Sequence, residues 1–106
     1  MDNFSVIYKI LKQLEIAMDY DEFDMDFVSA KHLKISENRL IKIWEMLSNE
    51  GYVDGIKVKY GVQGDVVISV CNPKITLKGI EYLSENSLMK KAANVAKGIK
   101  DSIPRL

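Results

Sequence analysis

One stretch, residues 36–51, constrains the fold more than any other because it carries both a start signal and a stop signal for a helix. Ser36 can accept a backbone N–H of the first turn, and Gly51 can adopt the left-handed conformation that ends a helix. Between them, apolar residues recur at intervals of three and four, which places them on one helix face: Leu40, Ile43, Trp44 and Leu47. The stretch therefore predicts a long helix with one buried side.

A shorter helix is expected directly before it, from about Ser29 to Lys34. Two helices joined by so short a turn are typical of a helix-turn-helix, here over about 29–51. His32 is the sole histidine, and no second histidine or reactive cysteine lies near it in the sequence. We therefore expect His32 to be a surface or half-buried side chain rather than a metal ligand or a proton carrier.

The N-terminal part predicts a helix followed by an acidic loop. Asp2 or Asn3 would cap a helix from about Phe4 to Met18, and the expected core stripe is Phe4, Ile7, Ile10, Leu11, Leu14 and Met18. Residues 19–26 hold five carboxylates without the glycine and glutamate spacing of a calcium loop. We expect a solvated loop held by Tyr20 and Phe23, then a short strand over residues 26–28.

A β-hairpin is expected over about 52–72. Two β-branched runs flank the turn at residues 61–65, Asp54-Gly55 predicts a bulge, and Asn72-Pro73 is expected to end the second strand. The turn glycines join two strands instead of opening a helix, which argues against a phosphate-binding loop. Cys71 is the only cysteine, so no internal disulfide can form, and we expect its side chain to be buried on the strand.

The C-terminal helical segment is expected over about 76–103. Thr76 would cap it, Gly79 predicts a close approach of the helix to the sheet, and residues 85–87 suggest a break between two helices. Beyond the break lies an apolar stripe that could pack on the first helix, pair with a second copy, or lie on an anionic membrane. The predicted partner face is Leu88, Ala92, Val95, Ala96 and Ile99.

Length and composition indicate one domain, residues 1–106, that needs no metal or disulfide to fold. The sequence has no apolar run of membrane-spanning length, and its acidic start is unlike a signal peptide, so a cytoplasmic location is expected. Fifteen basic and fifteen acidic residues cancel, but residues 1–27 hold two basic and seven acidic ones. Such segregation can leave a basic face elsewhere for a polyanion.

The order of the expected elements predicts an α+β fold of the winged-helix type: helix, short strand, helix-turn-helix, β-hairpin wing, and a C-terminal helix or helix pair. The chain also resembles the YjcQ family of small bacterial and phage or prophage proteins. The resemblance is carried by residues 8–12, 19–23, 35–37, 44–47 and 50–53, and above all by ITLKGIEYLSENSLMKKA at 75–92. It implies a winged-helix-like fold and a phage-related origin, and it supplies no active-site residues.

In a winged helix, the third helix enters the major groove and the wing touches the DNA backbone. The candidate base readers are Asn38, Arg39 and Lys42, and Asn49 lies further along the same outward face as a further candidate DNA contact. The candidate phosphate contacts are Lys31, Lys34, Lys57 and Lys59. We therefore expect a DNA-binding or regulatory module of phage type, with double-stranded DNA as partner.

The alternative expectation is a protein-interaction adaptor, such as a phage structural or assembly factor. The outward ridge of the same helix is expected to consist of Asn38, Lys42, Glu45 and Asn49. Ile41 and Met46 flank this ridge and could form such an interface. A single cysteine and a single histidine on separate elements do not assemble a nucleophile, its base and an orienting group. We therefore expect neither enzymatic activity nor a cofactor.

Overall fold

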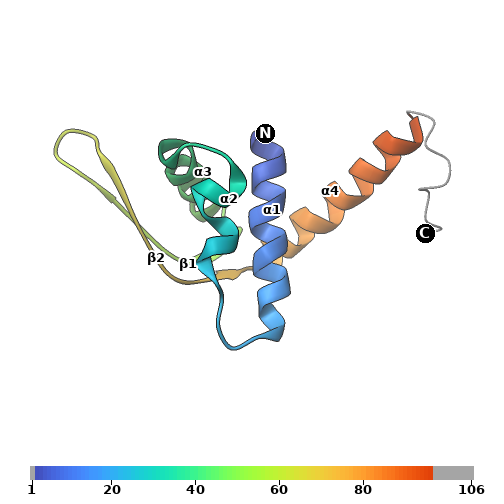
Figure 1. Ribbon diagram of the computed structural model, residues 1–106, viewed down its shortest axis with the longest axis horizontal. Helices are drawn as coiled ribbons and strands as arrows, with labels where there is room; N and C mark the ends of the chain where they lie inside the picture. The colour runs from blue at the N-terminus through green and yellow to red at the C-terminus, as the bar shows by residue number, and fades with distance from the viewer. Residues whose placement is uncertain (1, 97–106) are drawn as a thin grey trace.

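The structure is a computed structural model that describes the backbone of residues 2–96 and the side chains of residues 2–86. The elements in chain order are α1 (Asn3–Ile16), the 3₁₀ turns η1 (Ala17–Asp19) and η2 (Met25–Val28), α2 (Ala30–Leu33), α3 (Glu37–Asn49), β1 (Val53–Tyr60), β2 (Val66–Ile75) and α4 (Leu77–Ala96). This is an α+β arrangement with one two-stranded antiparallel sheet in the described residues. Figure 1 shows α1 at the centre, with α2, α3 and the projecting hairpin on one side and α4 leaving on the other.

Helix α1 starts as predicted but buries a slightly different face. The Asp2 carboxylate accepts the Ser5 backbone N–H at 2.8 Å, and this bond lowers the pKa of Asp2 below its ordinary value. The buried residues of α1 are Val6, Ile10, Leu11 and Leu14. Two members of the predicted stripe are wrong: Phe4 is 73% exposed and Met18 is 64% exposed. Phe4 lies in the first turn, nearly a quarter-turn from the centre of the buried face, and Met18 falls in η1, where the tighter winding rotates its side chain away.

The two helices predicted over residues 29–51 are present and are joined by a short turn. The Ser29 hydroxyl accepts the His32 N–H at 3.1 Å to start α2, and Lys34 ends it in the left-handed conformation with φ of 59°. The Ser36 hydroxyl accepts the Arg39 N–H at 3.1 Å to start α3. All four predicted core residues of α3, from Leu40 to Leu47, are buried.

The far end of α3 closes with a pair of backbone hydrogen bonds around Gly51, whose φ is +78°. The Tyr52 N–H donates to the Leu47 carbonyl at 2.9 Å, and the Gly51 N–H donates to the Ser48 carbonyl at 3.1 Å. This pattern is the Schellman motif, which requires a left-handed residue after the helix. Gly51 therefore stops α3 as predicted and turns the chain into β1.

The strand predicted at residues 26–28 is wrong, because this segment forms the 3₁₀ turn η2. The Asp24 carboxylate accepts the Asp26 N–H at 3.0 Å, and the Asp24 carbonyl accepts the Phe27 N–H at 3.2 Å. These two bonds wind the backbone tightly, so it cannot offer the extended edge that a sheet needs. In the described part of the chain, β1 therefore pairs with β2 alone.

The hairpin extends further than predicted. Its strands pair from Tyr60↔Val66 to Val53↔Ile75, with the expected irregularity at Asp54-Gly55-Ile56. The expectation that Asn72-Pro73 ends β2 is wrong, since β2 continues to Ile75. Proline fits because the register shift leaves residues 71–73 outside the regular ladder, where no N–H is needed.

Cys71 is also placed differently from its prediction. It lies on β2, but its side chain is exposed. The half-buried residues of β2 before the irregularity are Val66, Ile68 and Val70, so Cys71 falls on the opposite face by strict alternation. A β-branched run on its own did not reveal which face of this strand packs on the core.

Thr76 joins α3, the hairpin and α4 at one point. Its hydroxyl donates to the Gly51 carbonyl at 2.6 Å and accepts the Gly79 N–H at 3.1 Å, while its own N–H donates to the Tyr52 carbonyl at 3.1 Å. A Cβ on Gly79 would collide with that Tyr52 carbonyl oxygen and would lie 2.7 Å from Ile75 Cγ1. The predicted close approach of helix and sheet at Gly79 is thus confirmed.

Helix α4 runs without interruption from Leu77 to Ala96, so the break predicted at residues 85–87 is wrong. The Asn86 side-chain amide donates to the Tyr82 carbonyl at 2.9 Å, one turn earlier. This bond satisfies the polar side chain inside the helix, so the polar run does not compete with helix formation. The first turns of α4 pack through Tyr82, whose ring lies 5.1 Å from that of Tyr52.

Candidate functional site

The predicted base readers and half of the predicted phosphate contacts lie on one corner, formed by α2, the turn after it and the outer face of α3. Lys31 and Lys34 are exposed there because Ala30 and Leu33 take the buried positions of α2. On α3, Asn38, Arg39 and Lys42 are exposed near its start, whereas Asn49 is exposed as its last residue and lies away from this corner. We call the set Lys31, Lys34, Asn38, Arg39 and Lys42 the α2–α3 corner.

Lys57 and Lys59 do not join this corner. Residues alternate between the two faces of a strand, so Lys57 and Lys59 share one face of β1 while Ile56, Val58 and Tyr60 share the other. The Tyr60 face is the one turned to α3, because the Tyr60 hydroxyl donates to Glu45 Oε2 at 2.6 Å. The two lysines therefore lie on the face of the hairpin that points away from α3, opposite Ser69 and Val67 of β2.

The bond between Tyr60 and Glu45 fixes the hairpin against the ridge of α3. It also raises the pKa of Tyr60 above its ordinary value, because the hydrogen bond to the carboxylate favours the protonated hydroxyl. Glu45 was predicted to be part of the free outward ridge of α3, and the structure instead shows it half-buried beneath the hairpin. The ridge is thus tied to the hairpin at Glu45, while Asn38 and Lys42 remain exposed.

A cleft of about 550 Å³ lies between α3 and the tip of the hairpin. Ile41, Met46 and Val66 give it apolar walls, and Met46 remains 44% exposed. The remaining lining residues are Asn38, Lys42, Glu45 and Gly64. Sequence reasoning had placed Ile41 and Met46 on the flanks of the ridge, but it could not place the hairpin tip over them.

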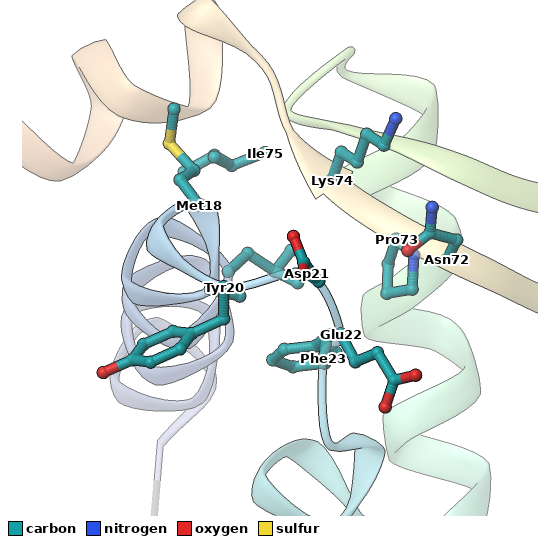
Figure 2. Close-up of a pocket in the computed structure, with 11 residues that line it drawn as sticks. Met18, Tyr20, Asp21, Glu22, Phe23, Asn72, Pro73, Lys74 and Ile75 are labelled. Carbon is teal, nitrogen blue, oxygen red and sulfur yellow. The ribbon is translucent and has the colours of Figure 1, made fainter.

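A second hollow, of about 440 Å³, lies where α1 ends (Figure 2). One wall is formed by residues 17–23 and the other by residues 72–75 of β2. Figure 2 shows Met18 beside Ile75, and Asp21 and Lys74 on the two walls. Tyr20, which was expected to hold the acidic loop, is mostly exposed, whereas Phe23 packs against the core as predicted.

The remaining features to describe are the single histidine, the possible metal ligands and the character of the helices. His32 is exposed, as expected, and its ring meets the Phe27 ring edge-on with a centroid distance of 6.0 Å. Across residues 2–86, no three His, Cys, Asp or Glu side chains gather closely enough to hold a metal ion. Among the described helices, none has the length and apolar character required to cross a membrane.

The predicted partner face of the C-terminal segment lies beyond the residues whose side chains the structure describes. Leu88, Ala92, Val95 and Ala96 fall on the part of α4 that is described by its backbone alone, and Ile99 lies outside the described residues. Their proposed pairing with a second copy stays a prediction.

Comparison with known proteins gives one match, to the family model described as YjcQ protein, over residues 8–102. The chain belongs to the YjcQ family. The resemblance found in the sequence is thereby confirmed. No curated protein and no solved structure is significantly similar to the chain.

The match to the YjcQ family model begins inside α1, at residue 8, and includes the α2–α3 corner, the hairpin and α4. The description of the family names no activity and no ligand. The function of this YjcQ family member therefore has to be argued from its own surfaces.

Proposed function

We propose that this chain is a non-catalytic winged-helix module of phage or prophage type that binds double-stranded DNA or regulates through it. The observation that carries this proposal is the α2–α3 corner, where four exposed cations and Asn38 surround the start of a well-capped helix. One carboxylate, Glu37, lies among them in the first turn of α3. The corner is consequently the most basic surface around the helix-turn-helix.

The corner suits the usual division of labour in DNA recognition. Asn38 can bridge adenine, and Arg39 or Lys42 can contact guanine, if the first two turns of α3 enter the major groove. Lys31 and Lys34 come from the preceding helix and its end, where side chains normally reach phosphates. Because the hairpin is tied to Glu45 and the first turns of α3 are exposed, the duplex would approach at Asn38, Arg39 and Lys42.

The charge count sets the strength of binding that is expected. The two phosphate-contacting lysines give a slope of log K against log salt of about −1.8, and counting Arg39 and Lys42 as well brings it to at most about −3.6. The corresponding loss of affinity between 50 and 200 mM salt is about tenfold to a hundredfold. The hairpin lysines would add to this slope only if the wing also lies on the duplex. A weak, strongly salt-dependent complex is therefore the expected behaviour.

Two matched double variants test the proposal by fluorescence anisotropy with a labelled random-sequence duplex. Lys31→Gln with Lys34→Gln removes two charges from the corner, and Lys57→Gln with Lys59→Gln removes two from the outer face of the hairpin. The corner pair should reduce the salt slope by about two, and the hairpin pair should reduce it by less. No binding by the parent protein at low salt, or equal slopes for the parent and the corner pair, would refute DNA binding through this corner.

A second candidate function, a protein-interaction adaptor, is favoured by the cleft between α3 and the hairpin. Its walls are apolar at Ile41, Met46 and Val66, and Met side chains adapt to imperfectly matched partners. Met46→Glu should then abolish recovery of a partner from a phage-infected lysate, while the Lys31→Gln, Lys34→Gln protein still recovers it. If the Met46→Glu protein recovers the partner and the Lys31→Gln, Lys34→Gln protein does not, the interaction belongs to the α2–α3 corner instead.

A further inference from the structure

A groove of about 240 Å³ lies where α1 ends and the chain turns toward α2, at the lower end of the molecule in Figure 1. It adjoins the hollow of Figure 2 and shares Tyr20 and Phe23 with it. Figure 2 shows the Tyr20 ring turned away from the β2 wall of that hollow. The groove is lined by Gln13, Ile16, Ala17, Tyr20, Glu22, Phe23, Asp24 and Phe27.

Three large apolar side chains at this groove remain open to solvent. Ile16 is 45% exposed, Tyr20 is 69% exposed and Phe27 is 46% exposed. Phe23 forms a floor that is anchored in the core, and Phe27 is held edge-on against the His32 ring. Single exposed apolar residues are common, but several around one concave surface are typical of an interaction site.

The groove is also bordered by acidic side chains. Glu22 and Asp24 line it, and Asp19, Asp21 and Asp26 belong to the same segment. Within the described residues, the one ion pair is Lys12 with Glu15 on α1, so none of these five carboxylates has a cationic partner there. Asp24 is engaged with the Asp26 backbone N–H, which leaves Glu22 as the carboxylate at the groove with no hydrogen bond to the described chain.

We propose that this acidic groove, formed by Ile16, Tyr20, Phe23, Phe27, Glu22 and Asp24, docks a basic amphipathic segment of a partner protein. Apolar side chains of the segment would cover Tyr20 and Phe27, and its lysines or arginines would lie against the surrounding carboxylates. Charge complementarity selects this occupant, because the groove is negative while the α2–α3 corner is positive. The inference does not depend on DNA binding.

Size and position favour a peptide segment of another protein over other occupants. The volume lies below the range of about 300–1,000 Å³ that is usual for small-molecule sites, but it suits a few side chains. Helix α4 starts beside α1 and runs away from it for 20 residues, which is about 30 Å (Figure 1). The described end of α4, at Ala96, therefore lies far from the groove of its own molecule.

The test uses the full chain and a labelled synthetic peptide built of leucine and lysine at helical spacing, with a second peptide carrying glutamate for each lysine. Tyr20→Ser and Phe27→Ser should each weaken binding of the lysine peptide about tenfold, as expected for a buried aromatic anchor. Phe4→Ser, which removes an exposed aromatic ring from the other end of α1, should change the affinity less than twofold. Glu22→Gln should weaken binding and reduce its salt dependence.

The competing outcomes are distinct. Binding of the glutamate peptide as tightly as the lysine peptide, or equal loss of affinity in Phe4→Ser and Phe27→Ser, would overturn the proposal. Absence of binding by the parent protein would do the same. A mass that rises with concentration in light scattering, and that Phe27→Ser returns to the monomer value, would show that the groove holds a second copy instead of a partner protein.

Discussion

Replacing Gly79 by alanine is expected to destabilise the fold, even though alanine is the better helix former. Alanine should gain about 1 kcal/mol in helix propensity at this position. The added Cβ, however, would collide with the Tyr52 carbonyl oxygen and lie 2.7 Å from Ile75 Cγ1. The Ile75 side chain can move, whereas the Tyr52 carbonyl is held by the Thr76 N–H at 3.1 Å.

The net magnitude follows from these opposing contributions. Overpacking costs about 1–3 kcal/mol, and displacing the Tyr52 carbonyl would weaken a hydrogen bond worth about 1 kcal/mol. After the propensity gain is subtracted, Gly79→Ala should lower the free energy of unfolding by about 2 kcal/mol. For a chain of this length, that corresponds to a fall in Tm of about 8–16 °C.

Urea unfolding can be followed through the fluorescence of Trp44, the only tryptophan, which is 3% exposed in the folded chain. Ser84→Ala is the matched control, because it makes an alanine at an exposed position of the same helix and should be neutral or slightly stabilising. If Gly79→Ala is as stable as Ser84→Ala, the close contact between α4 and the start of β1 does not exist. The account of how α3, the hairpin and α4 are joined would then fail with it.

Three further variants test other contacts. Thr76→Val should destabilise the fold by about 1–2 kcal/mol because it removes both hydrogen bonds of the hydroxyl, while Thr76→Ser should retain most of the stability. Equal urea midpoints for the two variants would contradict this. Trp44→Ala should cost about 3–5 kcal/mol in thermal or urea unfolding, and a variant that melts like the parent would show that the buried face of α3 is misassigned. Glu45→Gln should return the raised pKa of Tyr60 toward its ordinary value in an NMR titration; in the parent, the stabilisation from this bond is present below the unfolded pKa of tyrosine and lost as the pH rises through the higher folded pKa.

The two helices over residues 29–51 agree with the sequence-based prediction, whereas the candidate DNA-binding surface differs from it. The ridge of α3 was predicted to be free along its length, but Glu45 is tied to Tyr60 and the hairpin tip lies over Ile41 and Met46. Of the eight predicted contact residues, five lie at the α2–α3 corner, Lys57 and Lys59 lie on the outer face of the hairpin, and Asn49 lies at the far end of α3. Variants of the hairpin and of the corner therefore test different surfaces, a division that the sequence alone did not reveal.

The groove at the end of α1 shows the opposite case, in which sequence reasoning missed a surface. Tyr20 was expected to anchor its loop, and Phe27 was expected on a strand. In the structure, both lie at the groove because η1 and η2 wind the chain tightly on either side of the loop. The available signal was the mixture of aromatic and acidic residues in one short segment.

The sequence by itself determined the parts whose causes are local. The hydroxyls of Ser29, Ser36 and Thr76 start α2, α3 and α4, and Gly51 ends α3, because caps act within a few residues of themselves. The buried face of α3 followed from helical periodicity, and family membership followed from short runs of residues.

The tertiary structure alone decided which faces are covered. Phe4 and Met18 are as apolar as Val6, yet they are exposed, because burial depends on where α3, β2 and α4 meet α1. The exposure of Cys71, the passage of β2 through Pro73 and the outward face of Lys57 and Lys59 all depend on how the hairpin is set against α3. Such contacts join residues that are distant in the chain, so no local pattern encodes them.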